Sequence, residues 1–572
     1  MRVFRFFVFA STIGWLGCTH AEPPPEDASN VAAEATPALE GPAPGQAAAA
    51  APLFEGLGDF SHPITVSSPL AQRYFDQGMI LSFGFNHAEA ERSFRYAAEL
   101  DESCAMCWWG VAYVLGPNIN APMSPEAGTQ AWEALGRAQA LAPKVRAKEQ
   151  DYITALSSRY AEAPSADRTA LNEAYAEAVK QLAAKYPDDV DATILAVEAL
   201  MDLHPWNFYE FKTGEARPWT PEILALLEGA LEAAPDHPMA NHLYIHLVEA
   251  SHEPERALPS AARLPQRAPG AGHLVHMPAH VYIRVGQYNK ASKANQAAVE
   301  ADQDYITQCR AQGRYPAAYH PHNYHFLSRT ASLEGRSALA LDAANRMKNH
   351  VSSGNMMRQP GLSTLQHYWV TPLYVMARFG MWDSILEYAK PDEDLVYPIA
   401  VWHYARGLAF TTDGKLAEAN AELAELERAA ADPAIEAVGV WDINTAKSLV
   451  EIAALILEGE IAAKIGQQSR AISLIRKAVV LEDQQNYDEP PSWYMSTRHV
   501  LGALYLQAGK PKAAERVYRE DLAVFPNNGW ALFGLAQALD AQGKRSEAAT
   551  ARVEFEQAWS NADVELTASW FM

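Results

Sequence analysis

Small and large apolar residues recur at fixed spacings along most of the chain. In residues 502–526, "GALYLQAGKPKAAERVYREDLAVFP", they fill positions 8, 11, 15, 20, 24 and 32 of a 34-residue unit, as Gly502, Tyr505, Gly509, Ala514, Tyr518 and Pro526. Small residues at such positions let two antiparallel helices approach closely, and the large ones fill the space between successive units. The pattern therefore predicts a helical hairpin over this segment.

The same pattern returns elsewhere. It is found in residues 78–100, 407–419 and 459–479, where the matching residues are Gly78, Ala90, Phe94, Ala97, Gly407, Gly414, Ala419, Gly459, Gly466, Ala471, Ile475 and Ala478. One hairpin cannot bury its apolar face alone, so a series of hairpins predicts a stacked array with a continuous core. The predicted fold class is all-α.

These positions resemble the tetratricopeptide-repeat family over roughly residues 70–560. The resemblance implies an all-α solenoid of helical hairpins. Proteins of this family mostly bind a peptide or protein partner in a concave groove, although a fold alone does not fix function. The stretches "GFNHAEAERSF", "CAMCWWG" and "GPNIN" also resemble those of uncharacterised bacterial exported repeat lipoproteins, and that second resemblance implies no activity.

The net charge of the chain bears on which class of macromolecule it binds. The chain has 572 residues, of which 49% are hydrophobic, and a formal charge of −23. Binding the phosphate backbone of a nucleic acid needs clustered lysine and arginine, so this charge argues against a nucleic-acid partner. A peptide or protein partner in the groove is compatible with it.

The first residues predict export. Arg2 and Arg5 precede an apolar run that ends at Leu16, as in a signal peptide, and the run is too short to span a membrane. Gly17 before Cys18 resembles a bacterial lipoprotein cleavage site, which makes Cys18 the lipidated residue of a periplasmic or outer-membrane-anchored protein. Simple secretion stays open as the alternative, because Trp15 departs from the usual aliphatic residue.

The rest of the chain divides by sequence character. An Ala- and Pro-rich stretch with almost no large apolar residue predicts a disordered tether. The predicted parts are a signal peptide (1–18), a tether (19–55), N-terminal helical repeats (56–190), His-rich central repeats (191–390) and C-terminal repeats (391–572). In an oxidising compartment, Cys104 and Cys107 are expected to form a local disulfide.

Histidines of the central repeats share a register. Taking Gly286 as position 15 of its unit places His273, His276 and His280 at positions 2, 5 and 9. The preceding unit has His242, His246 and Glu249 at positions 5, 9 and 12, and the following unit has His322, His325 and Arg329 at positions 2, 5 and 9. Positions 2, 5, 9 and 12 follow the spacing of one helix face. In the tetratricopeptide family this face of the first helix lines the groove.

This register predicts a metal site. The candidate ligands are His242, His246, Glu249, His273, His276, His280, His322 and His325. Neutral imidazoles with a carboxylate suit zinc, copper or iron. His242, His246 and Glu249 resemble a facial set of two histidines and one carboxylate on a single helix. His237 and His252 fall outside the register and are expected to be structural.

Two functions remain open at this point. One is an exported scaffold that binds a metal ion, for storage or for hydrolytic or oxidative chemistry. The other is an interaction module of the bacterial envelope without metal, and neither establishes an enzyme. The segments 201–211 and 315–326 are either packed connections or covers over the groove, with Tyr319 and His320 as the candidates in the second.

Overall fold

The computed structural model describes residues 51–571, apart from residues 166, 211–212, 310–314, 360 and 442. The predicted signal peptide, Cys18 and most of the predicted tether lie outside the described residues. Among the described helices, none is both long and apolar enough to cross a membrane.

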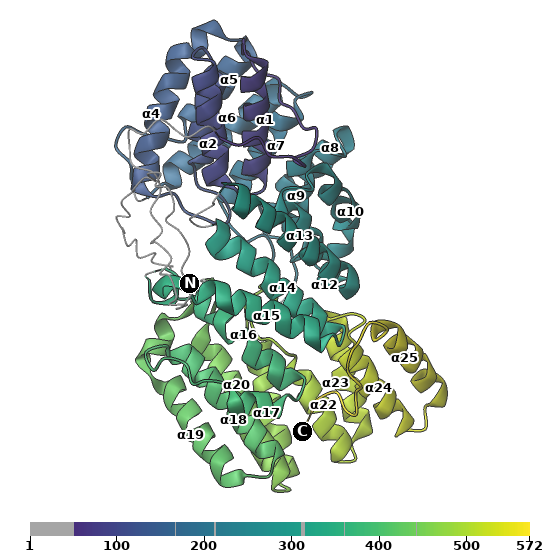
Figure 1. Cartoon of the computed structure of the whole chain (residues 1–572). Helices are drawn as coiled ribbons and strands as arrows, with labels where there is room; N and C mark the ends of the chain where they lie inside the picture. The colour runs from purple at the N-terminus through teal and green to yellow at the C-terminus, as the bar shows by residue number, and fades with distance from the viewer. Residues whose placement is uncertain are drawn as a thin grey trace, which may run out of the picture. The chain divides into compact units, whose positions relative to one another are not determined.

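Most of the described chain is helical, and the predicted all-α solenoid of helical hairpins is confirmed. Strand structure within the described residues is confined to a short antiparallel pair, β1 (Gly439–Val440) and β2 (Asn444–Thr445). Successive helices pack as antiparallel pairs, for example α1 with α2, α18 with α19 and α20 with α21 (Figure 1).

The helices group into two compact units. The first unit comprises residues up to 278 and residues 297–319. Its helices are α1 (Pro69–Phe83), α2 (His87–Leu100), α3 (Ala105–Val114), α4 (Pro125–Leu141), η1 (Ala142–Lys144), α5 (Ala147–Ser157), α6 (Thr169–Lys185), α7 (Val190–Asp202), α8 (Thr220–Ala233), α9 (Pro238–Val248), η2 (Pro254–Ala257), α10 (Leu258–Arg267), α11 (Gly272–His276) and η3 (Tyr315–Tyr319).

The second unit comprises residues 279–296 and the residues from 320 onward, and residues of α12 (Pro278–Arg284) and α13 (Tyr288–Cys309) belong to both units. Its further helices are α14 (His320–Leu333), α15 (Ser337–Val351), η4 (Ser353–Arg358), α16 (Leu365–Arg378), α17 (Trp382–Glu387), α18 (Val396–Thr412), α19 (Leu416–Ala431), η5 (Pro433–Ala437), α20 (Ala446–Lys464), α21 (Gln468–Glu482), α22 (Thr497–Gln507), α23 (Pro511–Val524), α24 (Gly529–Asp540) and α25 (Arg545–Ala558).

Glycines at helix contacts leave room for an aromatic ring between neighbouring helices. A Cβ added at Gly78 or at Gly110 would come within 2.5 Å of the Phe94 ring, so this ring lies between two helices that only glycine allows to approach. In the second unit the Tyr518 ring lies in the same way between Gly502 and Gly534. The repeat pattern in the sequence thus marks real contacts between helices.

Gly502→Ala is expected to lower the free energy of unfolding by about 1–3 kcal/mol, because the new methyl group overlaps the buried Tyr518 ring. Urea unfolding followed by circular dichroism measures this loss. Gly229→Ala is the matched control: it also lies inside a helix, but its Cβ would meet no atom within 4 Å. The control should be neutral or stabilising by about 0.5–1 kcal/mol. Equal effects at both glycines would contradict the packing described.

In the turns within hairpins, glycine is needed because it can adopt a positive φ. Gly509 ends the helix before α23 with a φ of 67°, a left-handed conformation that side chains with a Cβ disfavour. Its amide donates to the Leu506 carbonyl group. The glycine at position 15 of the repeat therefore closes the first helix of a hairpin.

The beginning of the described chain is packed rather than extended. Ala51 is buried, and its carbonyl oxygen accepts a hydrogen bond from the Tyr74 hydroxyl group at 2.7 Å. Gln77 of α1 donates to the Pro52 carbonyl group and accepts from the Phe54 amide. Polar side chains of α1 therefore bind the backbone of the last residues of the predicted tether.

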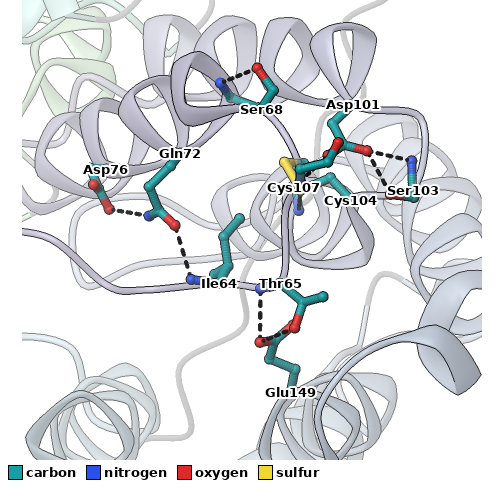
Figure 2. The surroundings of a disulfide bond; sticks show 12 residues. Ile64, Thr65, Ser68, Gln72, Asp76, Asp101, Ser103, Cys104, Cys107 and Glu149 are labelled. Atoms are coloured by element: carbon teal, nitrogen blue, oxygen red, sulfur yellow. Dashed lines mark hydrogen bonds between the residues drawn. A yellow bond between two sulfur atoms is a disulfide. The ribbon is translucent and has the colours of Figure 1, made fainter.

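Cys104 and Cys107 are joined by a disulfide at the start of α3. Cys104 is the N-cap residue, and its sulfur also accepts the Cys107 amide at 3.1 Å (Figure 2). Just before it, Asp101 accepts hydrogen bonds from Ser103 and from Ser67. The disulfide and the Asp101 carboxylate together fix the turn between α2 and α3.

A buried carboxyl group makes the stability of the second unit depend on pH. Glu460 of α20 is 5% exposed, and burial raises its pKa to about 8. The folded protein therefore keeps a proton that the unfolded chain loses above about pH 4.3. Because the folded state binds more protons, stability falls as the pH rises from about 4.3 to about 8.

Glu460→Gln is expected to remove this dependence, because glutamine mimics the protonated acid. At pH 7 the free energy of unfolding of the variant should exceed that of the wild type by about 4 kcal/mol. This pH lies about 2.7 units above 4.3, and each unit contributes about 1.4 kcal/mol. Urea unfolding at pH 5, 7 and 8 measures the effect. Parallel pH profiles for variant and wild type would show that Glu460 ionises normally in the folded protein.

Candidate metal centre

The first part of the site is built on α9. His237 is the N-cap residue, and its Nδ1 accepts the Ala240 amide at 3.2 Å, while its Nε2 lies 2.8 Å from the Asp191 carboxylate. Proline occupies the first helical position, where a backbone N–H would have no partner within the helix, so its missing N–H costs nothing. His242 and His246 follow one turn apart on this helix, and both are buried. His237 thus has the structural role expected for it.

The second part is the short helix α11, which carries His273. Its first residue, Gly272, lies against the Asp302 carboxylate so closely that a Cβ does not fit. The His273 amide donates to the Tyr315 hydroxyl group at 3.1 Å, and this hydroxyl group donates to Asp302 at 2.7 Å. Burial and the Asp302 charge raise the pKa of Tyr315 well above its usual value, so it stays a donor. These contacts fix the place of His273.

The three side chains converge. His242, His246 and His273 each offer a ring nitrogen, and the three atoms lie within 4.8 Å of one another. Nε2 of His242 is 3.1 Å from Nε2 of His273, a hydrogen-bond distance without metal. Two nitrogens bound to one ion at about 2.0–2.1 Å are separated by about 2.9–3.4 Å. Replacing the shared proton by a metal ion therefore needs little movement.

Glu249 orients His246 and lies outside the cluster of ligand atoms. Its carboxylate oxygen is 2.9 Å from Nδ1 of His246, and Glu249 is completely buried. A carboxylate on Nδ1 favours the tautomer with its proton there, which leaves Nε2 to bind metal. The expected facial set is thus arranged differently: the third nitrogen comes from His273 on another helix, and the carboxylate stands behind a ligand.

Three aromatic side chains surround the histidines. The Phe85 ring lies 5.0 Å from the rings of His242 and His273, and the Tyr319 ring stacks on Phe85 at 5.8 Å. The Trp206 ring meets His246 edge to face at 5.0 Å. The histidines are therefore enclosed by rings instead of lining an open groove, because Trp206 and Tyr319 both reach them.

Asn120 joins two of these rings. Its Oδ1 accepts the Trp206 indole N–H, and its amide donates to the Tyr319 hydroxyl group, both at 3.1 Å. Phe85 and Trp206 have φ values of 59° and 60°, which are costly for residues with a Cβ. Trp206 is also 39% exposed, a large value for this residue type. Strained aromatic residues beside a histidine cluster are typical of a ligand site.

The remaining predicted ligands are divided between the units. His276 is buried in the first unit, with its ring 5.9 Å from that of His273. In the second unit the rings of His280 and His322 are 5.8 Å apart, and those of His325 and His367 are 5.3 Å apart. Burial lowers the pKa of His280 to about 3 and that of His367 to about 4, so both are neutral.

Two other histidines are placed differently from the site. Tyr319, one of the two residues expected to cover the site, contacts the His273 ring. His320 belongs to the second unit, where its ring contacts those of Tyr324 and His350. His252, which lies outside the register and was expected to be structural, is exposed.

Sequence reasoning missed Phe85 and Asn120 as site residues. Both lie in stretches, "GFNH" and "GPNIN", that were noted only for their resemblance to exported repeat proteins. An aromatic residue directly after glycine at a hairpin turn was the available signal, since that position often takes a positive φ.

Comparison with known proteins adds little beyond this geometry. No protein-family model matches the chain, and no curated protein matches it. Among solved structures, the chain is similar to the APC/C hetero-tetramer Cut9–Hcn1, with 12% identity, coverage of 86% of this chain and 74% of that chain, and a TM-score of 0.29. It is also similar to the human IFIT1 dimer with m7Gppp-AAAA, with 12% identity, coverage of 88% and 92%, and a TM-score of 0.29. At these scores the similarities carry no argument about function.

Proposed function

We propose that this helical-repeat scaffold binds one transition-metal ion through His242, His246 and His273. The observation that carries the proposal is the convergence of three buried ring nitrogens within 4.8 Å, from two separate helices. Imidazole nitrogens are preferred ligands of transition metals, so three of them gathered in one place favour a bound metal ion.

The ligand set indicates the class of metal. Imidazole nitrogens suit zinc, copper and iron, and hard oxygen-preferring ions such as magnesium are disfavoured. Three protein nitrogens leave a further coordination position for water or for a group of a bound partner, as in catalytic zinc sites. The rings of Phe85, Trp206 and Tyr319 lie around the histidines and limit the size of such a group.

We further propose that the protein acts outside the cytoplasm, held by a lipid on Cys18. The signal-peptide pattern of residues 1–18 supports export. The disulfide between Cys104 and Cys107 is compatible with an oxidising compartment.

Titration of the metal-free protein with zinc, against a chromophoric chelator as competitor, tests the proposal. The wild type is expected to bind one zinc ion with high affinity, and His242→Ala to lose this binding. His252→Ala, at an exposed histidine, is the control and should bind like the wild type. If the wild type and His242→Ala bind zinc equally, the site is not a metal site, and a metal-free interaction module becomes the better account.

A further inference from the structure

The described part of the second unit contains a buried guanidinium group that forms no ion pair. Arg329 of α14 is 4% exposed and lies over the rings of Tyr494 and Phe525, at 5.6 and 5.5 Å. Within the described residues, its Nε has no hydrogen-bond partner. Aromatic faces offset part of the cost of burying this cation, but they do not neutralise it.

A second buried guanidinium group belongs to Arg378, at the end of α16. It stacks on Trp530 at 3.5 Å and donates to Nδ1 of His499 at 2.8 Å. Because Nδ1 of His499 accepts this bond, its proton lies on Nε2, which is 2.9 Å from the Asp521 carboxylate. Arg378 therefore contacts a neutral imidazole, and the Asp521 carboxylate contacts the other side of that imidazole.

The charges of the two guanidinium groups are incompletely balanced. Burial lowers the pKa of Arg378 well below its usual value, and the charge of Arg329 lowers it further. Asp521 supplies one negative charge near them. Burial raises the pKa of the neighbouring Glu482 to about 7, so this carboxyl group is only partly ionised at neutral pH.

We propose that Arg329 and Arg378 form a binding site for a small oxyanion, a carboxylate or a phosphate. An uncompensated buried charge costs several kcal/mol, and an anion between the two guanidinium groups offsets that cost. The planar N–H fork of arginine matches the oxygens of both anion classes. This inference is independent of the metal site, which lies in the first unit.

The repeat register supports an anion, and not a metal ion, as the ligand near Arg329. Arg329 occupies position 9 of its unit, the position that His246 holds in the metal centre. A permanent positive charge at this position repels a metal ion and attracts an anion. His325, one turn earlier on the same helix, is buried, and burial, followed by the charges of His367, His322 and Arg329, lowers its pKa well below the usual value.

Isothermal titration of the full chain with inorganic phosphate and, separately, with acetate tests the proposal, at constant ionic strength set by sodium chloride. The wild type is expected to bind one anion per chain with saturation, and the tighter of the two anions identifies the ligand class. Arg329→Lys keeps the charge but loses the fork, and should bind at least about tenfold more weakly. The proposal is overturned if neither anion binds, or if Arg329→Lys binds as the wild type does.

A stability comparison separates an anion site from a structural charge. Without added anion, Arg329→Met should melt at the wild-type temperature or above it, since it removes an unbalanced charge. Arg159→Met is the matched control: Arg159 is equally buried but paired with Asp202 at 2.8 Å, so its loss leaves a buried carboxylate and lowers the melting temperature. If Arg329→Met melts as far below the wild type as the control does, Arg329 is a partner of Asp521 and the anion site is rejected.

Discussion

His273→Ala is expected to weaken zinc binding by more than about 100-fold, which is beyond the roughly 10–100-fold loss that follows removal of a residue behind a ligand. The change deletes one of three ring nitrogens and leaves His242 without its 3.1 Å partner. Two histidines one turn apart on a helix still bind zinc, but only weakly. The dissociation constant from chelator competition measures the effect.

This loss has to be separated from unfolding. His273 is buried on a five-residue helix held by the Tyr315 hydroxyl group, which bonds the backbone amide and not the side chain. Far-ultraviolet circular dichroism of His273→Ala should therefore match the wild type. A variant with intact helical signal and wild-type zinc affinity would remove His273 from the ligand set.

Glu249→Gln is expected to weaken zinc binding by about 10-fold while all three ligands remain. Glutamine still accepts a hydrogen bond from Nδ1 of His246, but it lacks the negative charge that strengthens the imidazole as a ligand. The pH dependence of zinc binding distinguishes this role from simple packing. Without the carboxylate charge the imidazole is less basic, so the affinity of the variant should fall at a lower pH than that of the wild type. Identical affinities across the pH range would show that Glu249 does not act on the metal.

The repeats could be predicted because their signal is local. Gly78 and Gly502 are fixed by close contact with Phe94 and Tyr518, and such contacts leave a periodic trace in the sequence. The grouping of the helices into two units has no periodic pattern in the sequence and could not be predicted from it. Residues of α13 belong to both units, and its polar sequence gives no sign of the boundary.

Part of the candidate site could be predicted from the histidine register. It places His242 and His246 on one helix face, because their spacing depends only on helical periodicity. It expected Glu249 among the ligands, but the last turn of α9 directs this carboxylate to Nδ1 of His246. Rings from distant segments, Phe85 and Trp206, enclose the site, and contacts of such long range cannot be read from periodicity.

Elemental analysis of the exported protein is the most direct test of the metal centre. The full chain is purified from a bacterial host without affinity tag or chelator, and metals are measured by mass spectrometry beside the double variant His242→Ala/His273→Ala. The wild type is predicted to carry close to one zinc, copper or iron ion per chain, and the double variant almost none at unchanged helical content. A wild type free of these metals, or equal metal in both proteins, would contradict the assignment.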